Sequence, residues 1–216
     1  MTRFLRLVLA LVLLGTAGCF GTSDEVSGKR APRFEPPGPG MAAPRLALVL
    51  GSGGRRGFAH IGVLKALTEN GVRPDLIIGS SVGAVVGSLY AGGMSAAEIE
   101  KLAYSLYSLE FFEFKTLFGR PATGRAVQDF VNKHVQGRAI EELPVAFAAA
   151  ATRARDSSLV LFNRGDTGTA VRASAASPDE FEPVRISGEA FVDGDVASPV
   201  PIRAARRMGA RVVIAV

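Results

Sequence analysis

Short apolar runs alternate along this chain with longer stretches in which apolar residues recur every three or four positions. The runs are nearly continuous in Leu, Ile, Val and Ala, which is typical of strands buried on both faces of a parallel sheet. Strands are predicted at residues 45–50, 76–78, 144–151, 158–162, 191–195 and 211–216. Helices are predicted at residues 58–70, 84–90, 95–109, 123–135, 167–175 and 199–208. Because strands and helices alternate, the pattern predicts an α/β fold with a mostly parallel sheet.

The most informative stretch follows the second strand, where Gly79-Ser80-Ser81-Val82-Gly83 leads directly into a helix. A strand, a tight turn and a helix in this order push Ser81 out of the backbone at the tip of an elbow. Gly79 and Gly83 remove side chains that would collide where strand and helix cross. Ser81 is therefore a candidate nucleophile, with a helix N-terminus beneath it that favours negative charge. The alternative is a serine that only caps the helix.

A second glycine-rich turn, residues 51–57, follows the first strand and precedes the first helix. A phosphate-binding P-loop would need a lysine that this turn lacks, and a dinucleotide-binding pattern starting at Gly51 meets Arg56 where its last glycine belongs. We therefore expect no nucleotide ligand. The turn is instead interpreted as a source of backbone N–H groups for an oxyanion hole.

A serine nucleophile needs a base, and the only histidines are His60 and His134. In the α/β-hydrolase order the histidine follows the acid, and no histidine lies beyond residue 134. A carboxylate acting directly on Ser81 is therefore expected. Asp193 is the best placed, because it ends a predicted strand next to Gly194, and parallel sheets gather functional groups at the carboxyl ends of their strands.

The composition limits the classes of function. With 48% hydrophobic and 21% charged residues in 216 positions, the chain is long and apolar enough to bury a sizeable core. Its net charge of +5 comes from scattered arginines without a dense basic run, which favours an anionic membrane surface over nucleic acid as a partner. The single cysteine, Cys19, excludes an internal disulfide and a cysteine-based zinc site. No cofactor or metal is expected.

The first 19 residues have the pattern of an export signal. Arg3 and Arg6 precede an apolar run at residues 7–14, which is shorter than the roughly 20 residues of a membrane span. Small residues then lead to Cys19, an arrangement that resembles the lipobox of bacterial lipoproteins, although Thr16 stands where leucine is usual. The resemblance implies an exported lipoprotein anchored to a membrane of the bacterial cell envelope through an acylated Cys19. Ordinary cleavage near Ala17, leaving a free cysteine, is the alternative.

Residues 20–43 are rich in Pro, Gly, Ser and charge and are predicted to form a flexible tether. The hydrolase domain is expected at residues 44–216. The last predicted strand runs to residue 216, which leaves open a domain that continues beyond it.

Four motifs in one order resemble those of the patatin-like phospholipase family: the glycine turn with the following helix, the elbow, Arg172-Ala173-Ser174, and Asp193-Gly194. The resemblance covers residues 44–216. It implies a three-layer α/β/α sandwich, a Ser81–Asp193 catalytic dyad and an oxyanion hole made by Gly53, Gly54 and Arg56. For Arg56 two alternatives stay open: its guanidinium could hold a phospholipid phosphate, or the residue could brace the loop. The chain departs from the family pattern at Ser52 and Asp195, where glycine or alanine is usual, and at residues 177–180.

The expected function is hydrolysis of an ester of a phospholipid or related lipid through an acyl-enzyme. Two alternatives stay open: an inactive patatin-like lipoprotein that binds lipid or a protein, and an esterase, thioesterase or peptidase with the same dyad. An aromatic cluster at residues 111–118 suits either core packing or an acyl-chain pocket.

Overall fold

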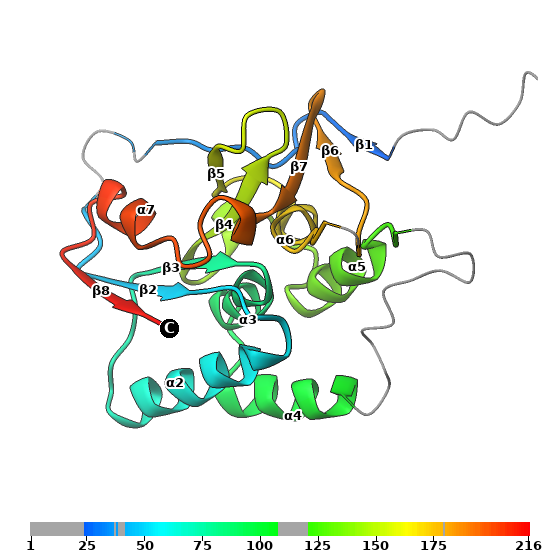
Figure 1. The fold of residues 1–216 in the computed structure, drawn as a ribbon. Helices are drawn as coiled ribbons and strands as arrows, with labels where there is room; N and C mark the ends of the chain where they lie inside the picture. The colour runs from blue at the N-terminus through cyan, green and yellow to red at the C-terminus, as the bar shows by residue number, and fades with distance from the viewer. Residues whose placement is uncertain (1–23, 37, 39–41, 108–120, 179) are drawn as a thin grey trace, which may run out of the picture.

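The computed structural model describes residues 24–36, 38, 42–107, 121–178 and 180–216. Its centre is an eight-stranded sheet (Figure 1). The strands are β1 (Glu25–Val26), β2 (Leu46–Leu50), β3 (Leu76–Ser80), β4 (Ala146–Arg153), β5 (Leu159–Phe162), β6 (Val184–Ile186), β7 (Glu189–Asp193) and β8 (Val212–Ala215). The helices are α2 (Phe58–Glu69), α3 (Val82–Ala91), α4 (Ala96–Tyr107), α5 (Arg125–His134), α6 (Thr167–Ser174) and α7 (Ile202–Arg207), with short 3-10 turns η1 (Gly54–Gly57), η2 (Ile140–Glu142) and η3 (Gly194–Val196).

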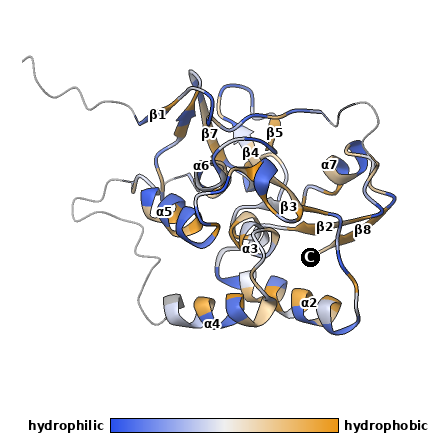
Figure 2. Ribbon diagram, turned by 180° about the vertical axis from the view of Figure 1, so that it is seen from behind, coloured by the Kyte–Doolittle hydropathy of each residue, from blue (hydrophilic) through white to orange (hydrophobic). Residues whose placement is uncertain are grey.

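The sheet separates two apolar cores, because successive side chains of a strand point to opposite faces. Leu48 and Leu50 of β2 belong to the larger core, which is completed by α2, α3, α4, α5 and α6. Ala47 and Val49 belong to the smaller core, which α7 completes. Figure 2 shows apolar colour along the central strands and mixed colour on the outer helices. The predicted three-layer α/β/α arrangement is confirmed, with one layer much thicker than the other.

Four of the seven strand pairings in the described part of the chain are parallel. The parallel strands β8, β2, β3 and β4 lie side by side, as the apolar runs predicted. The pairings of β5 and β7 with β4 are antiparallel, and β6 and β7 form a hairpin. Ser187 and Gly188 turn this hairpin with positive φ angles of 50° and 83°, as a type I′ turn requires.

Strands β3 and β7 meet end to end along the same side of β4. Strand β5 pairs with residues 149–152 of β4, so β3, at 146–150, and β7, at 151–153, both lie on the other side. Ser80 pairs with Ala150, and Asp193 pairs with Ala151. The carboxyl ends of the two strands, which run in opposite directions, are therefore one residue apart along β4.

The segment predicted as a tether differs from that expectation between residues 24 and 36, which pack on the domain. Strand β1 pairs with β6, and Ala31 is buried. The Glu35 N–H donates to Asn163 Oδ1 (2.8 Å), while Asn163 Nδ2 donates to the Glu35 carbonyl (2.7 Å). Composition predicted flexibility because it does not reveal that these polar groups have partners more than a hundred residues away.

Asp24 completes this attachment through Arg172 of α6, a guanidinium whose side chain is only 2% exposed. Asp24 Oδ2 lies 2.7 Å from Arg172 Nη1. The guanidinium also donates to the Thr123 carbonyl (2.7 Å) and to Gln128 Oε1 (3.2 Å). The carboxylate also contacts Arg125, whose side chain is 57% exposed.

Replacing Asp24 should destabilise the domain because it leaves a buried guanidinium without its charged partner. We expect Asp24→Asn to lower the free energy of unfolding by about 2 to 3 kcal/mol, since neutral acceptors remain at Arg172. Arg125→Gln, which removes the exposed partner of the same carboxylate, should cost less than about 1 kcal/mol. Urea unfolding of the three proteins measures both values, and equal losses would contradict the assignment.

Candidate active site

Ser81 lies at the tip of the turn between β3 and α3, with φ 56° and ψ −125°. This conformation is unfavourable for a residue with a side chain and is held by the surrounding structure. The Ser81 N–H donates to Ser174 Oγ (3.0 Å), and the Ser174 hydroxyl donates to the Ala150 carbonyl (2.5 Å). Ser174 of α6 thus fastens the elbow to β4, a role that the sequence did not reveal although its motif was noted.

The three motif glycines allow backbones to cross closely at this turn. A Cβ on Gly79 would overlap the backbone of Ala84, one on Gly83 would overlap the Leu50 carbonyl, and one on Gly194 would overlap the Ala150 carbonyl. A side chain at Gly79 would therefore push β3 away from α3, one at Gly83 would push α3 away from β2, and one at Gly194 would push η3 away from β4. The glycines therefore bring Ser81 and Asp193 to one place.

The Ser81 hydroxyl donates to Asp193 Oδ2 at 2.7 Å. Asp193 Oδ1 accepts the N–H of Asp195 at 2.8 Å. The backbone of Asp193 is also held, because its N–H donates to the Ala176 carbonyl (2.9 Å) and its carbonyl accepts from Thr152 Oγ1 (2.7 Å). The carboxylate is in position to accept the proton of the Ser81 hydroxyl.

Burial raises the pKa of Asp193 from its ordinary 3.8 to about 6. The side chain is almost completely enclosed, at 3% exposure, and a charged carboxylate loses hydration there. The Asp195 N–H and the Ser81 hydroxyl oppose the rise, while the charges of Asp195 and Glu180 add to it. Asp193 is therefore a stronger base than a solvated aspartate and is still ionised at neutral pH.

The glycine turn lies beside Ser81. Within the described residues, the N–H groups of Gly53 and Gly54 donate no hydrogen bond to another protein group. Gly53 has φ 148° and ψ 7°, a conformation open only to glycine. Both N–H groups are available to an oxygen in the cavity.

Arg56 requires a correction to its predicted place in the oxyanion hole. Its N–H donates to the Gly53 carbonyl at 3.0 Å and thereby closes the turn η1. The motif position suggested a free donor because a sequence does not show which N–H groups a tight turn consumes. The Arg56 side chain still lines the cavity.

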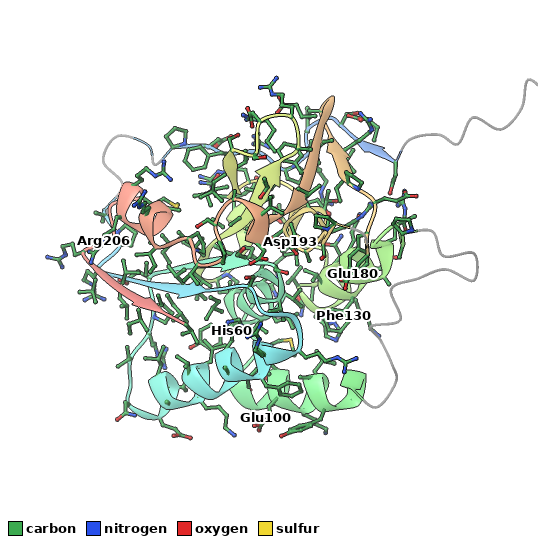
Figure 3. The ribbon with its side chains drawn as sticks, viewed as in Figure 1. His60, Glu100, Phe130, Glu180, Asp193 and Arg206 are labelled. Carbon is green, nitrogen blue, oxygen red and sulfur yellow. The ribbon has the colours of Figure 1, made fainter. Side chains whose placement is uncertain are left out.

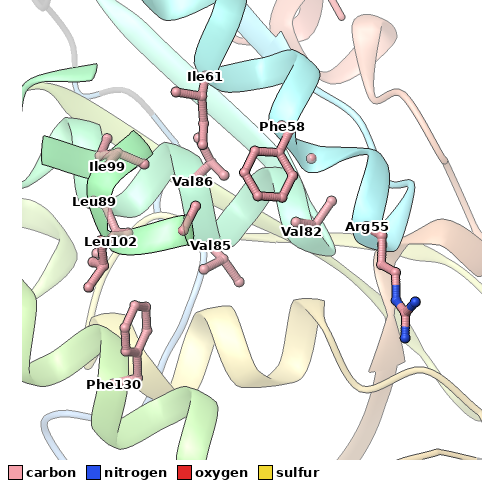
Figure 4. Close-up of a pocket in the computed structure, with 13 residues that line it drawn as sticks. Arg55, Phe58, Ile61, Val82, Val85, Val86, Leu89, Ile99, Leu102 and Phe130 are labelled. Carbon is pink, nitrogen blue, oxygen red and sulfur yellow. The ribbon is translucent and has the colours of Figure 1, made fainter. Parts of the chain in front are cut away.

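Ser81 and Asp193 open into a cavity of about 610 Å³. Arg55, Arg56, Glu180 and Asp195 contribute charge to its wall; Figure 3 labels Asp193, Glu180 and Phe130 around it. A smaller pocket of about 80 Å³ adjoins it, and both are lined by Val82, Val85 and Phe130. Apolar side chains from α2, α3, α4 and α5 converge on this second pocket (Figure 4). The arrangement suits a polar group near Ser81 joined to an apolar chain.

Neither histidine is bonded to Ser81. His60 is buried at 4% exposure, and burial lowers its pKa. His134 Nδ1 lies 2.7 Å from the Phe130 carbonyl, and the two rings pack together at 4.5 Å. The described residues contain no group of three or more His, Cys, Asp or Glu side chains suited to a metal ion. Cys19 and the aromatic cluster at residues 111–118 lie outside the described residues.

Comparison with known families matches residues 48–206 to the family described as patatin-like phospholipase. This chain belongs to that family. An NTE family protein of Mycobacterium tuberculosis is 38% identical over 184 residues, which cover 82% of this chain and 50% of the relative. Patatin-like phospholipase domain-containing protein 6 of Homo sapiens is 34% identical over 184 residues, covering 79% of this chain and 13% of the human protein. The chain thus spans half or less of the length of these relatives.

Among solved structures, VipD from Legionella pneumophila has a similar fold. The match has a TM-score of 0.56 at 14% sequence identity and covers 79% of this chain and 50% of VipD. At this level of identity the likeness concerns the fold alone.

Neutralising Asp193 should stabilise the folded protein at neutral pH. The rise in its pKa from 3.8 to about 6 means that the folded protein binds the proton more tightly than the unfolded chain, so ionised Asp193 costs about 3 kcal/mol at pH 7. We expect Asp193→Asn to be more stable than the wild type at pH 7 by up to that amount. The difference should shrink as the pH falls from 6 to 4, where the wild-type side chain takes up its proton. Thermal unfolding from pH 4 to 8 measures it, and a less stable variant at pH 7 would contradict the argument.

The conformation of Gly53 leads to a separate prediction. Alanine cannot adopt φ 148° without strain, so Gly53→Ala should turn the N–H groups of the loop away from Ser81. Loss of one such donor typically lowers turnover by about 10² to 10³. Ester hydrolysis should fall by that factor with a much smaller change in KM, while circular dichroism should show a folded protein. Gly188→Ala, which strains the exposed hairpin turn instead, is the control and should keep its turnover.

Proposed function

We propose that this chain is a serine acyl hydrolase that cleaves the ester bonds of phospholipids or related lipids. The observation that carries the proposal is the 2.7 Å hydrogen bond between Ser81 and the buried carboxylate of Asp193. Membership of the patatin-like phospholipase family supports a lipid substrate. The apolar pocket beside Ser81 also supports one, because it offers a place for an acyl chain.

In the proposed reaction Ser81 Oγ attacks the carbonyl carbon of the ester while Asp193 takes the hydroxyl proton. The N–H groups of Gly53 and Gly54 stabilise the negative oxygen of the tetrahedral intermediate. The intermediate collapses to an acyl-enzyme, and the departing alcohol takes the proton from Asp193. A water molecule then attacks the acyl carbonyl, Asp193 accepts its proton, and the fatty acid leaves as Ser81 regains its hydrogen.

The nucleophile is tested with a fluorophosphonate probe and a chromogenic acyl ester. Ser81→Ala should abolish both labelling and hydrolysis, because no other hydroxyl is hydrogen-bonded to the side-chain carboxylate of Asp193 in the described structure. Ser80→Ala is the matched control: Ser80 is fully buried, and its hydroxyl donates to the Ser198 carbonyl at 3.3 Å. This variant should keep most of the activity. Labelling that survives in Ser81→Ala would reject the nucleophile.

We also propose that the protein is exported and held at a membrane by a lipid on Cys19. No helix in the described residues is long and apolar enough to cross a membrane. Asp24 lies only five positions after Cys19, a distance of at most about 18 Å along an extended chain. Since Asp24 is fastened to α5 and α6, such an anchor would hold the domain close to the lipid surface.

The anchor is tested by fractionating bacteria that produce the full chain. The wild type should sediment with membranes and incorporate a labelled fatty acid, whereas Cys19→Ala should do neither. Thr16→Leu introduces the usual lipobox residue, so this variant should be cleaved and acylated at Cys19 at least as well as the wild type. Equal fatty-acid labelling of wild type and Cys19→Ala would disprove lipidation at this residue.

A further inference from the structure

A side-chain contact joins the glycine turn to the loop that carries Asp193. The Ser52 hydroxyl donates to Asp195 Oδ1, and the Ser52 N–H donates to the Pro199 carbonyl at 2.9 Å. Asp195 in turn donates its N–H to Asp193 Oδ1 at 2.8 Å. Ser52 directly precedes Gly53 and Gly54. One continuous series of hydrogen bonds therefore runs from the carboxylate of the dyad to the loop with the free N–H groups.

We propose that Ser52 and Asp195 are paired positioning residues. Their hydrogen bond fixes the position of the glycine turn, residues 51–57, relative to the Asp193 carboxylate. The inference rests on the proposed function and goes beyond it, because neither side chain has a part in the acyl-transfer steps. Both residues line the catalytic cavity, so the link spans the wall where the substrate carbonyl would lie.

The sequence supports a pair rather than two unrelated substitutions. Ser52 and Asp195 are two of the places where the chain departs from the pattern that it resembles, and they lie 143 positions apart. With glycine at both positions no side chain would connect the two loops. Gly53 and Gly54 have high backbone freedom because they lack side chains. The hydrogen bond from the preceding Ser52 to Asp195 of η3 limits that freedom.

Asp195 also brings a negative charge close to the base. Its carboxylate and that of Glu180 both raise the pKa of Asp193, and the guanidinium groups of Arg55 and Arg56 stand on the same cavity wall. Asp195 thus affects the base in two separable ways, through its hydrogen bond to Ser52 and through its charge. Variants can remove one without the other.

The test is a double-mutant cycle with Ser52→Gly, Asp195→Gly and the double variant, followed by kcat and KM on a soluble acyl ester. Each single change should lower kcat by about tenfold, the effect of losing one hydrogen bond to a charged group. The double variant should be no slower than the single variants, because both remove the same link. Losses that multiply in the double variant, or single variants with wild-type kcat, would overturn the proposal.

The pH profile separates positioning from a merely structural role. Asp195→Asn keeps an oxygen that accepts from Ser52 but removes the charge, so the acidic limb of kcat/KM should move to lower pH with a smaller loss of kcat than in Asp195→Gly. Ser52→Ala should lower kcat, and the limb should stay in place. Glu180→Gln removes a neighbouring charge without touching Ser52 and should shift the limb in the same direction as Asp195→Asn. An unshifted limb in Asp195→Asn would contradict the electrostatic part.

Failure of the proposed function gives a different result. A wild type that neither hydrolyses esters nor reacts with a fluorophosphonate would refute the hydrolase. Thermal unfolding of the wild type, Ser52→Gly, Asp195→Gly and the double variant then tests the link. A coupled change in melting temperature supports the Ser52–Asp195 pair, and additive changes overturn it.

Discussion

The meeting of two strands on β4 determines where the proposed catalytic residues lie. β3 runs parallel to β4 and β7 runs antiparallel to it, and they end at neighbouring positions, Ala150 and Ala151. The elbow after β3 and the turn after β7 must therefore share one small space. Gly83 and Gly194 fit because each meets a backbone carbonyl where any side chain would collide. The hydrogen bond between Ser81 and Asp193 is a consequence of this junction. The apolar cores on the two faces of the sheet hold the junction in place.

The junction also explains why Asp193 carries an energetic cost. The buried Asp193 carboxylate loses most of its hydration, and in the described part of the chain the Asp195 N–H and the Ser81 hydroxyl donate the hydrogen bonds that replace it. A raised pKa is the measure of this cost, and the basicity that it gives would serve the proposed Ser81–Asp193 dyad, which has no imidazole. The apolar core contributes the stability that offsets the cost of burying this carboxylate. Stability and activity are thus expected to oppose each other at this residue.

The sequence predicted the parallel half of the fold because buried strands and amphipathic helices leave local patterns. The elbow around Ser81 and the strand end at Asp193 were likewise readable from neighbouring residues. The three-residue strand β6 was not predicted, although Ser187-Gly188 is a usable turn signal. Strand β1 and the long-range partners of Asp24 and Glu35 had no local signal, since those partners lie more than a hundred positions away. The same limit applied to Arg56, whose N–H is consumed by a turn that only coordinates reveal.

Asp193 and Asp195 show how two like residues on one loop acquire different properties. Asp193 is buried, bonded to Ser81 and raised in pKa, whereas Asp195 is exposed and bonded to Ser52. The difference arises from η3, which begins at Gly194 and directs the two side chains to different neighbours. The Asp195 N–H donates to the Asp193 carboxylate and orients it. The negative charge of the Asp195 side chain raises the pKa of Asp193, so the same residue also makes Asp193 harder to ionise. A glycine there would keep the N–H donor and lose the charge, so the aspartate changes the strength of the base without removing the bond that orients it.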